Sequence, residues 1–165
     1  MLTARQVDLV QESFVQLQGH GSLFGRAFYE RMFERNPNIR HLFKGDEEAQ
    51  AAKFVEMIAT LVAGLNRIEQ LKPAVHHLGL RHVHYGVRPH DYPVFGEALI
   101  WTLERFLGPA LDRETREAWT AFYDTLVEQM AGPLDHVAKP ALAKCGAKEE
   151  PLPGAPTVNS EGGDG

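Results

Sequence analysis

Several things that other protein classes require are scarce in this sequence. The 165 residues include a single cysteine, Cys145, which excludes an internal disulfide framework and any cysteine-rich metal site. Lysine and arginine number 17 against 22 aspartates and glutamates, so there is no excess of positive charge for nucleic acid or an anionic membrane. No apolar run is long enough to span a bilayer, and no signal peptide precedes the first helix. We therefore expect a cytoplasmic protein with no nucleic-acid partner and no membrane partner.

Common catalytic motifs are also missing, and helical periodicity dominates what remains. The sequence has no glycine-rich phosphate loop, no HExxH motif and no nucleophile elbow. No segment alternates apolar and polar residues with a period of two, whereas several segments repeat apolar residues at helical spacing. The pattern predicts an all-α fold. The expected helices span residues 3 to 19, 22 to 35, 36 to 43, 47 to 66, 71 to the turn at 85–87, 95 to 106, and 112 to Gly132-Pro133.

The chain length predicts one domain followed by a tail. We expect the folded domain to cover residues 1–132, and residues 133–143 could extend its last helix. From Lys144 the composition shifts to lysine, glutamate, proline, glycine and serine, which cannot bury enough apolar surface to order itself. Residues 144–165 are therefore predicted to be a disordered C-terminal tail.

One histidine stands where an apolar residue would pack. Leu71, Val75 and Leu78 recur at helical spacing, and the next position on this stripe is His82. Neutral imidazole is the commonest metal ligand in proteins, so His82 is a candidate ligand. A hydrogen-bonded core histidine would give the same pattern, and the stretch alone leaves both interpretations open. Four neighbouring histidines fall off the stripe and are expected in solvent: His76, His77, His84 and His90.

Two further polar side chains occupy apolar positions on their helices. Tyr29 faces inward on the second helix, and Gln50 lies one turn before Phe54 at the head of the long helix. With Phe43 and Phe54 as apolar walls, the set predicts a flat slot with one strong ligand on one side and two hydrogen-bonding groups opposite. Such a slot suits haem iron held by one histidine, with a small diatomic ligand on the other face.

Four segments in order carry a resemblance to a known family. These are AFYERMFERNPNIRHLF (residues 27–43), LGLRHVHYGVRPHDYPVFGEAL (78–99), LGPAL (107–111) and REAWTAFYDTLVEQM (116–130). Across residues 1–132 the chain resembles bacterial globins, above all the globin domain of flavohaemoglobins, and its C-terminal helix also resembles that of neuroglobin-like proteins. The resemblance implies a globin fold, a three-on-three helical sandwich around a haem.

The resemblance also implies roles for particular residues. His82 matches the proximal iron ligand, Tyr29 the ligand-facing tyrosine, Gln50 the distal glutamine and Phe43 the phenylalanine wedged against the haem. The full set expected to contact haem b (iron protoporphyrin IX) is Phe43, Gln50, Lys53, Phe54, His82, Tyr85, Val87 and Tyr92. Globins cross their second helix and the helix that the family counts as fifth at small residues. In this chain these are the expected helices over residues 22–35 and 47–66, and Gly25 and Ala51 fit that contact.

Two departures from flavohaemoglobins bear on chemistry. In those proteins a tyrosine matching Tyr92 and a glutamate on the last helix polarise the proximal histidine, but the matching stretch here reads Gly132-Pro133-Leu134-Asp135. The glutamate is missing at its place, which argues against peroxidase-like electron donation from that side. The flavin and nicotinamide domains would also need a few hundred further residues.

These features lead to one expected function and one alternative. The chain is expected to bind oxygen and other diatomics (NO, CO) reversibly, for oxygen transport or protection, as a monomer or weak homodimer with five-coordinate ferrous iron. The alternative is nitric oxide dioxygenation, in which oxygen held by Tyr29 and Gln50 converts nitric oxide to nitrate and a separate reductase restores the iron. A sensor would need an output domain or a docked partner. A haem-free bundle would bury the three polar side chains at a cost that leucine would avoid.

Overall fold

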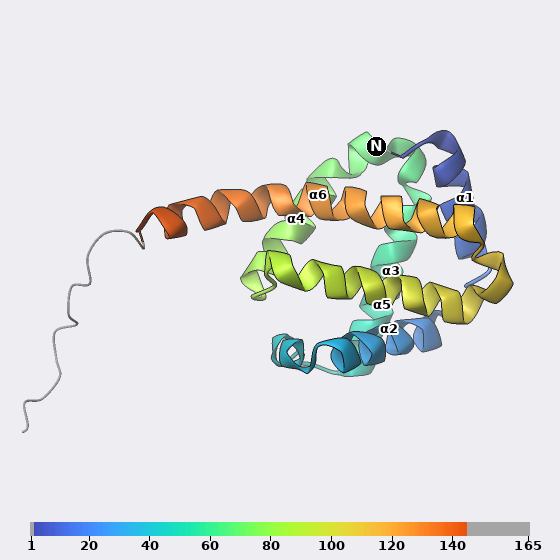
Figure 1. Cartoon of the computed structure of the whole chain (residues 1–165), viewed down its shortest axis with the longest axis horizontal. Helices are drawn as coiled ribbons and strands as arrows, with labels where there is room; N and C mark the ends of the chain where they lie inside the picture. The colour runs from blue at the N-terminus through green and yellow to red at the C-terminus, as the bar shows by residue number, and fades with distance from the viewer. Residues whose placement is uncertain (1, 145–165) are drawn as a thin grey trace, which may run out of the picture.

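Every regular element in the described part of the chain is a helix (Figure 1). The computed structural model describes residues 2–144, with side chains placed for residues 2–130. The α-helices are α1 (Ala4–Val15), α2 (Gly21–Arg35), α3 (Glu47–Ala63), α4 (Ile68–His84), α5 (Tyr92–Leu107) and α6 (Arg113–Lys144). Short 3₁₀ helices connect them: η1 (Pro37–Leu42), η2 (Leu65–Arg67), η3 (Pro89–Asp91) and η4 (Gly108–Ala110).

The α-helices form two layers of three. Helices α1, α3 and α4 make one layer, and α2, α5 and α6 make the other, with α2 packed on α3 and α6 packed on both α1 and α4. In Figure 1, α5 and α6 lie side by side while α3 runs across behind them. The expected all-α, three-on-three sandwich is therefore confirmed.

Side-chain caps fix where several helices begin, as the sequence indicates. The Thr3 hydroxyl accepts from the Gln6 backbone N–H, and the Gln6 side chain accepts from the Thr3 N–H, which is a capping box. The Asp46 carboxylate accepts from the first-turn amides of α3. The Asp112 carboxylate accepts from the Thr115 N–H at 2.8 Å and opens α6.

The closest backbone approach between α2 and α3 lies at a glycine. A Cβ placed on Gly25 would be 2.7 Å from the Ala51 carbonyl oxygen, so only glycine allows this crossing. The predicted Gly25–Ala51 contact is confirmed. It brings the next turn of α2, which carries Tyr29, beside the start of α3, which carries Gln50.

Several helix boundaries differ from expectation. Helix α1 ends at Val15, four residues early, and α3 ends at Ala63, three residues early. Helix α4 begins at Ile68, three residues early, so Pro73 lies inside it.

Of the two possibilities for residues 133–143, the structure has the extension: α6 continues through Gly132 and Pro133 to Lys144, and its end projects beyond the other helices in Figure 1. Proline disfavours helical geometry in the preceding residue partly by clashing with its Cβ, and Gly132 has none. Helix α5 begins at Tyr92, three residues early, because Pro93 falls in its first turn, where no amide bond is lost.

The core contains a large aromatic side chain whose polar group is hydrogen-bonded. Trp119 is fully buried, and its indole N–H donates to the Ser13 hydroxyl at 2.9 Å. Among the described residues, no helix combines the length and apolar character needed to cross a membrane. The predicted tail, apart from Lys144, and Cys145 lie outside the described residues.

Candidate functional site

His82 occupies the last turn of α4, with its ring half-buried. Its Nδ1 lies 2.8 Å from the Leu78 carbonyl oxygen one turn earlier. Because a carbonyl can only accept, Nδ1 must carry the proton, and the lone pair therefore sits on Nε2. Burial lowers the pKa of His82, the nearby Arg81 charge lowers it further, and the Leu78 hydrogen bond opposes both. The side chain is thus a neutral imidazole with its free nitrogen directed away from its own helix backbone.

The other histidines of this region differ from His82. His76, His77, His84 and His90 are all exposed, as expected from the apolar stripe. Val75 on that stripe is buried, and Leu71 and Leu78 are half-buried. The structure therefore places His82 alone among them on the inward side of α4.

Tyr29 and Gln50 meet across the α2–α3 crossing. The Gln50 Nε2 donates to the Tyr29 hydroxyl oxygen at 3.2 Å. Burial raises the pKa of Tyr29, and the bond from Gln50 partly offsets that rise, so the hydroxyl keeps its proton at neutral pH. Since the tyrosine oxygen is the acceptor in this pair, its O–H remains able to donate to a third group.

Aromatic side chains surround the Tyr29–Gln50 pair. Phe43 contacts the Tyr29 ring edge to face, with centroids 5.3 Å apart, and Phe54 stacks on Phe28 at 4.0 Å. Phe33 also contacts Phe43 edge to face, with ring centroids 5.3 Å apart. Phe28 and Phe33 were not among the predicted site residues. The signal that they belong here was their position on the same helical face as Tyr29.

Tyr92 supports the His82 side. Its ring lies 6.5 Å from the His82 ring, centroid to centroid, at an interplanar angle of 27°. Burial raises the pKa of Tyr92 to about 12, and among the described side chains its buried hydroxyl finds no hydrogen-bond partner. Tyr123 of α6, which the sequence analysis missed, donates to the Tyr92 backbone carbonyl at 2.6 Å and fixes the start of α5.

The two sides of the site approach each other at a turn. A Cβ on Gly86, which has a φ of +90°, would lie 3.3 Å from a methyl carbon of Leu42. This places the turn after His82 beside the segment that carries Phe43. Of the remaining predicted contact residues, Val87 is buried, whereas Lys53 is exposed and Tyr85 is 58% exposed.

The residues present fit a haem. Leu42, Phe43, Phe54, Leu78 and Val83 pack on the core yet stay partly uncovered, as expected of side chains that flank a flat apolar group. His82 would supply one nitrogen ligand, and the Tyr29–Gln50 pair would supply hydrogen-bond donors. The buried Tyr92 hydroxyl has no hydrogen-bond partner among the described side chains. In a haem-free core the unpaired Tyr92 hydroxyl and the partly uncovered apolar side chains would each be a cost.

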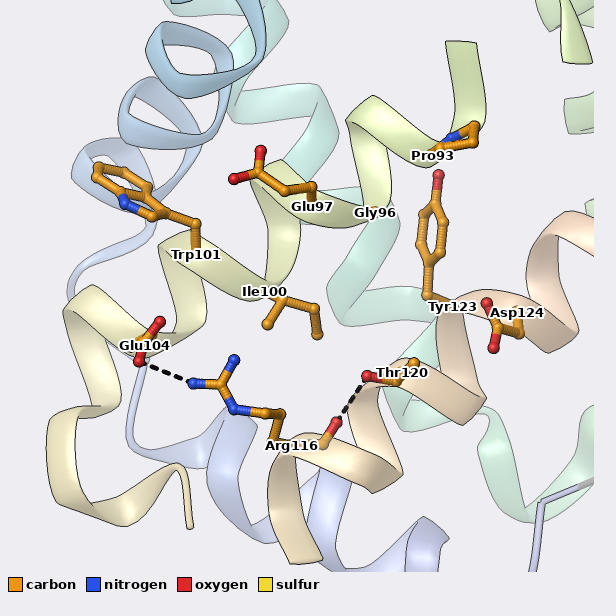
Figure 2. Close-up of a pocket in the computed structure, with 10 residues that line it drawn as sticks. All are labelled: Pro93, Gly96, Glu97, Ile100, Trp101, Glu104, Arg116, Thr120, Tyr123 and Asp124. Atoms are coloured by element: carbon orange, nitrogen blue, oxygen red, sulfur yellow. Dashed lines mark hydrogen bonds and ion pairs between the residues drawn. The ribbon is translucent and has the colours of Figure 1, made fainter. Parts of the chain in front are cut away.

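Two cavities lie away from these residues. One, of about 440 Å³, opens between α5 and α6, with Trp101, Ile100 and Tyr123 among its lining residues (Figure 2). The other, of about 260 Å³, lies between the α1–α2 corner and α3. None of the predicted site residues lines either cavity.

Two layers of three helices that carry an inward histidine and a hydrogen-bonded tyrosine–glutamine pair are typical of haem-binding helical proteins. Comparison with known sequences gives the family. A Globin family profile matches residues 26–130, and this chain belongs to the globin family. Membership implies that the chain binds haem, and globins bind small diatomic ligands.

Similar sequences include flavohemoproteins and a globin-like protein. The chain is 30% identical over 138 residues to a flavohemoprotein of Rhizobium meliloti, covering 80% of this chain and 34% of the relative. It is 28% identical to an uncharacterized globin-like protein of Aquifex aeolicus, covering 79% of this chain and 92% of the relative. The chain thus spans about a third of the length of the flavohemoproteins it matches.

A solved structure shares the fold. It is an engineered carbene transferase made from a proposed nitric oxide dioxygenase of Rhodothermus marinus, and it superposes with a TM-score of 0.76 at 26% identity. The match covers 87% of this chain and 99% of that structure. The expected resemblance to bacterial globins is confirmed.

Proposed function

We propose that this globin binds haem b and uses it to hold oxygen and other diatomic ligands (NO, CO) reversibly. His82 would hold the haem, and bound haem would supply an iron atom able to bind a diatomic molecule. The proposal rests on two hydrogen bonds, one made by His82 and one made by Gln50, each of which leaves one group free to act on a ligand. His82 Nδ1 donates to the Leu78 carbonyl, which frees Nε2, and Gln50 donates to Tyr29, which frees the phenolic O–H.

The side chains would divide the work between the two faces. The Leu78 bond holds the His82 ring in one tautomer and orientation, which strengthens its Nε2 as a ligand. On the other face, Tyr29 would donate its proton to a ligand that carries partial negative charge, and Gln50 would hold the phenol in place. Phe43 and Phe54 would exclude water from this side.

A second function, nitric oxide dioxygenation, draws support from the relatives. One similar structure derives from a proposed nitric oxide dioxygenase. The name flavohemoprotein indicates that those relatives contain both a flavin and a haem. The Tyr29–Gln50 pair suits this reaction equally well, because it would orient the oxygen that converts nitric oxide to nitrate. Each turnover leaves oxidised iron, so the reaction needs a separate flavin-containing reductase as electron donor.

The visible absorption spectrum tests the binding proposal. Protein produced with haem available should be red, and its pyridine derivative should show the spectrum of haem b. His82→Ala should lose most of the haem, whereas His84→Ala, which changes an exposed histidine two residues away, should keep it. Equal haem loss from the two variants would refute the ligand assignment.

Turnover of nitric oxide separates the two functions. The wild-type protein, supplied with a flavin reductase and oxygen, should bind oxygen reversibly in either case. Sustained formation of nitrate would establish dioxygenation as its activity. If nitrate forms no faster than in a mixture of nitric oxide, oxygen and reductase without the globin, reversible binding is the function.

A further inference from the structure

One face of α4 is rich in cationic and apolar groups that the proposed haem site leaves unused. We define the α4 outer face as His77, Leu80, Arg81, His84 and Arg88, the last lying just past the helix end. All five are exposed. Beside them Tyr85, at the C-terminal cap, is 58% exposed, and Leu80 is 43% exposed. These two are half of the four large hydrophobic side chains exposed among residues 2–130.

The geometry of α4 turns this face away from the rest of the protein. At about 100° per residue, His77, Leu80 and Arg81 lie opposite Val75, Gly79 and His82. A Cβ on Gly79 would lie 2.7 Å from the Met130 carbonyl oxygen, so α6 covers the inner side of α4. The α4 outer face therefore points to solvent, directly behind the helix turn that carries His82.

The charge of this segment is opposite to that of the whole chain. From residue 70 to residue 90 there is no aspartate or glutamate, but there are three lysines and arginines and five of the eight histidines. The chain as a whole carries a net charge of −5. Arg81 and Arg88 make no ion pair with any described side chain.

Helix electrostatics explain only part of this pattern. Cations in the last turn of a helix are stabilised by its dipole, which accounts for Arg81 and His84. That effect does not explain the exposure of Leu80, the position of Arg88 beyond the helix, or the lack of acidic residues over 21 positions. An apolar centre with a basic rim is the composition of a protein-binding patch.

We propose that the α4 outer face docks an acidic flavoprotein that reduces this globin. The inference rests on the proposed function, because only a haem protein that becomes oxidised needs a donor. A helix with its side chains is about 10–12 Å across, so a partner on this face would lie within roughly that distance of His82. One electron passes from the reduced flavin to ferric iron, giving ferrous iron and a flavin oxidised by one electron. The basic rim attracts an acidic partner, and Leu80 fills the centre of the contact.

The test measures binding, separately from turnover. Full-length protein is titrated with an oxidised, strongly acidic flavodoxin, and flavin fluorescence gives the affinity at low and at high salt. Arg81→Glu/Arg88→Glu should weaken binding by about tenfold at low salt, because two attractive charges become repulsive. The corresponding glutamine double variant should show a smaller loss in the same direction. Arg26→Glu/Arg67→Glu, exposed cations elsewhere with the same change in net charge, should bind like wild type.

Four other outcomes would contradict the proposal. Equal loss in both glutamate double variants would mean that net charge alone governs binding. Unchanged binding in Arg81→Glu/Arg88→Glu would place the partner elsewhere. Loss of self-association in sedimentation, with flavodoxin binding unaffected, would assign the face to a second copy of this chain. Binding to phosphatidylglycerol vesicles but not to flavodoxin would assign it to anionic lipid. The visible spectrum of the same samples reports haem independently, so a failure of the proposed function is seen separately.

Discussion

Removing the Tyr29 hydroxyl should speed the release of oxygen much more than the release of carbon monoxide. Bound oxygen carries partial negative charge and bound carbon monoxide carries little, so a hydrogen-bond donor stabilises the first selectively. In this structure the Tyr29 oxygen already accepts from the Gln50 amide at 3.2 Å, which leaves the phenolic O–H as the donor toward a ligand. Tyr29→Phe removes that donor while keeping the ring against Phe43.

The size of the effect follows from the bond geometry. A well-made hydrogen bond contributes about 1 to 1.5 kcal/mol, so losing the tyrosine bond alone would speed oxygen release by roughly tenfold. In Tyr29→Phe the Gln50 amide is freed and can turn to the ligand, which reduces the loss. Gln50→Leu removes only a long bond to the phenol and should speed release by about two- to fivefold. The double variant lacks both donors and should release oxygen faster than the product of the two single effects, by a few tens of times.

Stopped-flow replacement of oxygen by carbon monoxide, and of carbon monoxide by nitric oxide, measures the two dissociation rates. Carbon monoxide is the internal control, because any steric change in the pocket acts on both ligands. Equal acceleration of both would show that the effect is steric and that the hydrogen-bond argument is wrong. A double variant no faster than Tyr29→Phe would show that Gln50 never replaces the phenol.

Three further predictions concern stability and are measured by chemical denaturation of the haem-free protein. Burial lowers the pKa of His82, so near that pKa the unfolded chain binds more protons than the folded one. The free energy of unfolding should therefore fall as the pH drops below the ordinary histidine pKa of about 6.5. His82→Leu should make the free energy of unfolding less dependent on pH in this range. Gly25→Ala should cost about 1 to 3 kcal/mol by forcing α2 off the α3 backbone, whereas Gly45→Ala, with nothing within 4 Å, should be nearly neutral. Ser13→Ala should cost about 1 to 3 kcal/mol because it leaves the buried Trp119 N–H unpaired.

Residues whose position is set by their own helix were predictable from the sequence. The stripe that ends at His82 needed only helical spacing, and its burial pattern is confirmed. The Gly25–Ala51 crossing followed from the small size of both residues together with the family resemblance. The four exposed histidines around His82 followed from the same stripe.

Features that depend on contacts between distant segments were not predictable. No local pattern shows that Gln50 donates to Tyr29, a bond between different helices that decides which group remains free. The stacking of Phe54 on Phe28 and the bond from Tyr123 to the Tyr92 carbonyl depend equally on how helices pack. The continuation of α6 through Pro133 was left open by the sequence, because a glycine followed by a proline ordinarily ends a helix.

The His82 side of the site shows how the departure from flavohaemoglobins acts on chemistry. His82 Nδ1 donates to a backbone carbonyl, which is neutral, and a neutral acceptor leaves the imidazole less electron-rich than a carboxylate would. The Tyr92 ring lies beside His82, but its hydroxyl has no partner among the described side chains, so no described acid passes charge to the ring through it. A weakly polarised histidine favours holding a diatomic ligand intact over cleaving an O–O bond. The geometry around His82 therefore agrees with the Tyr29–Gln50 pair in supporting the proposed ligand binding.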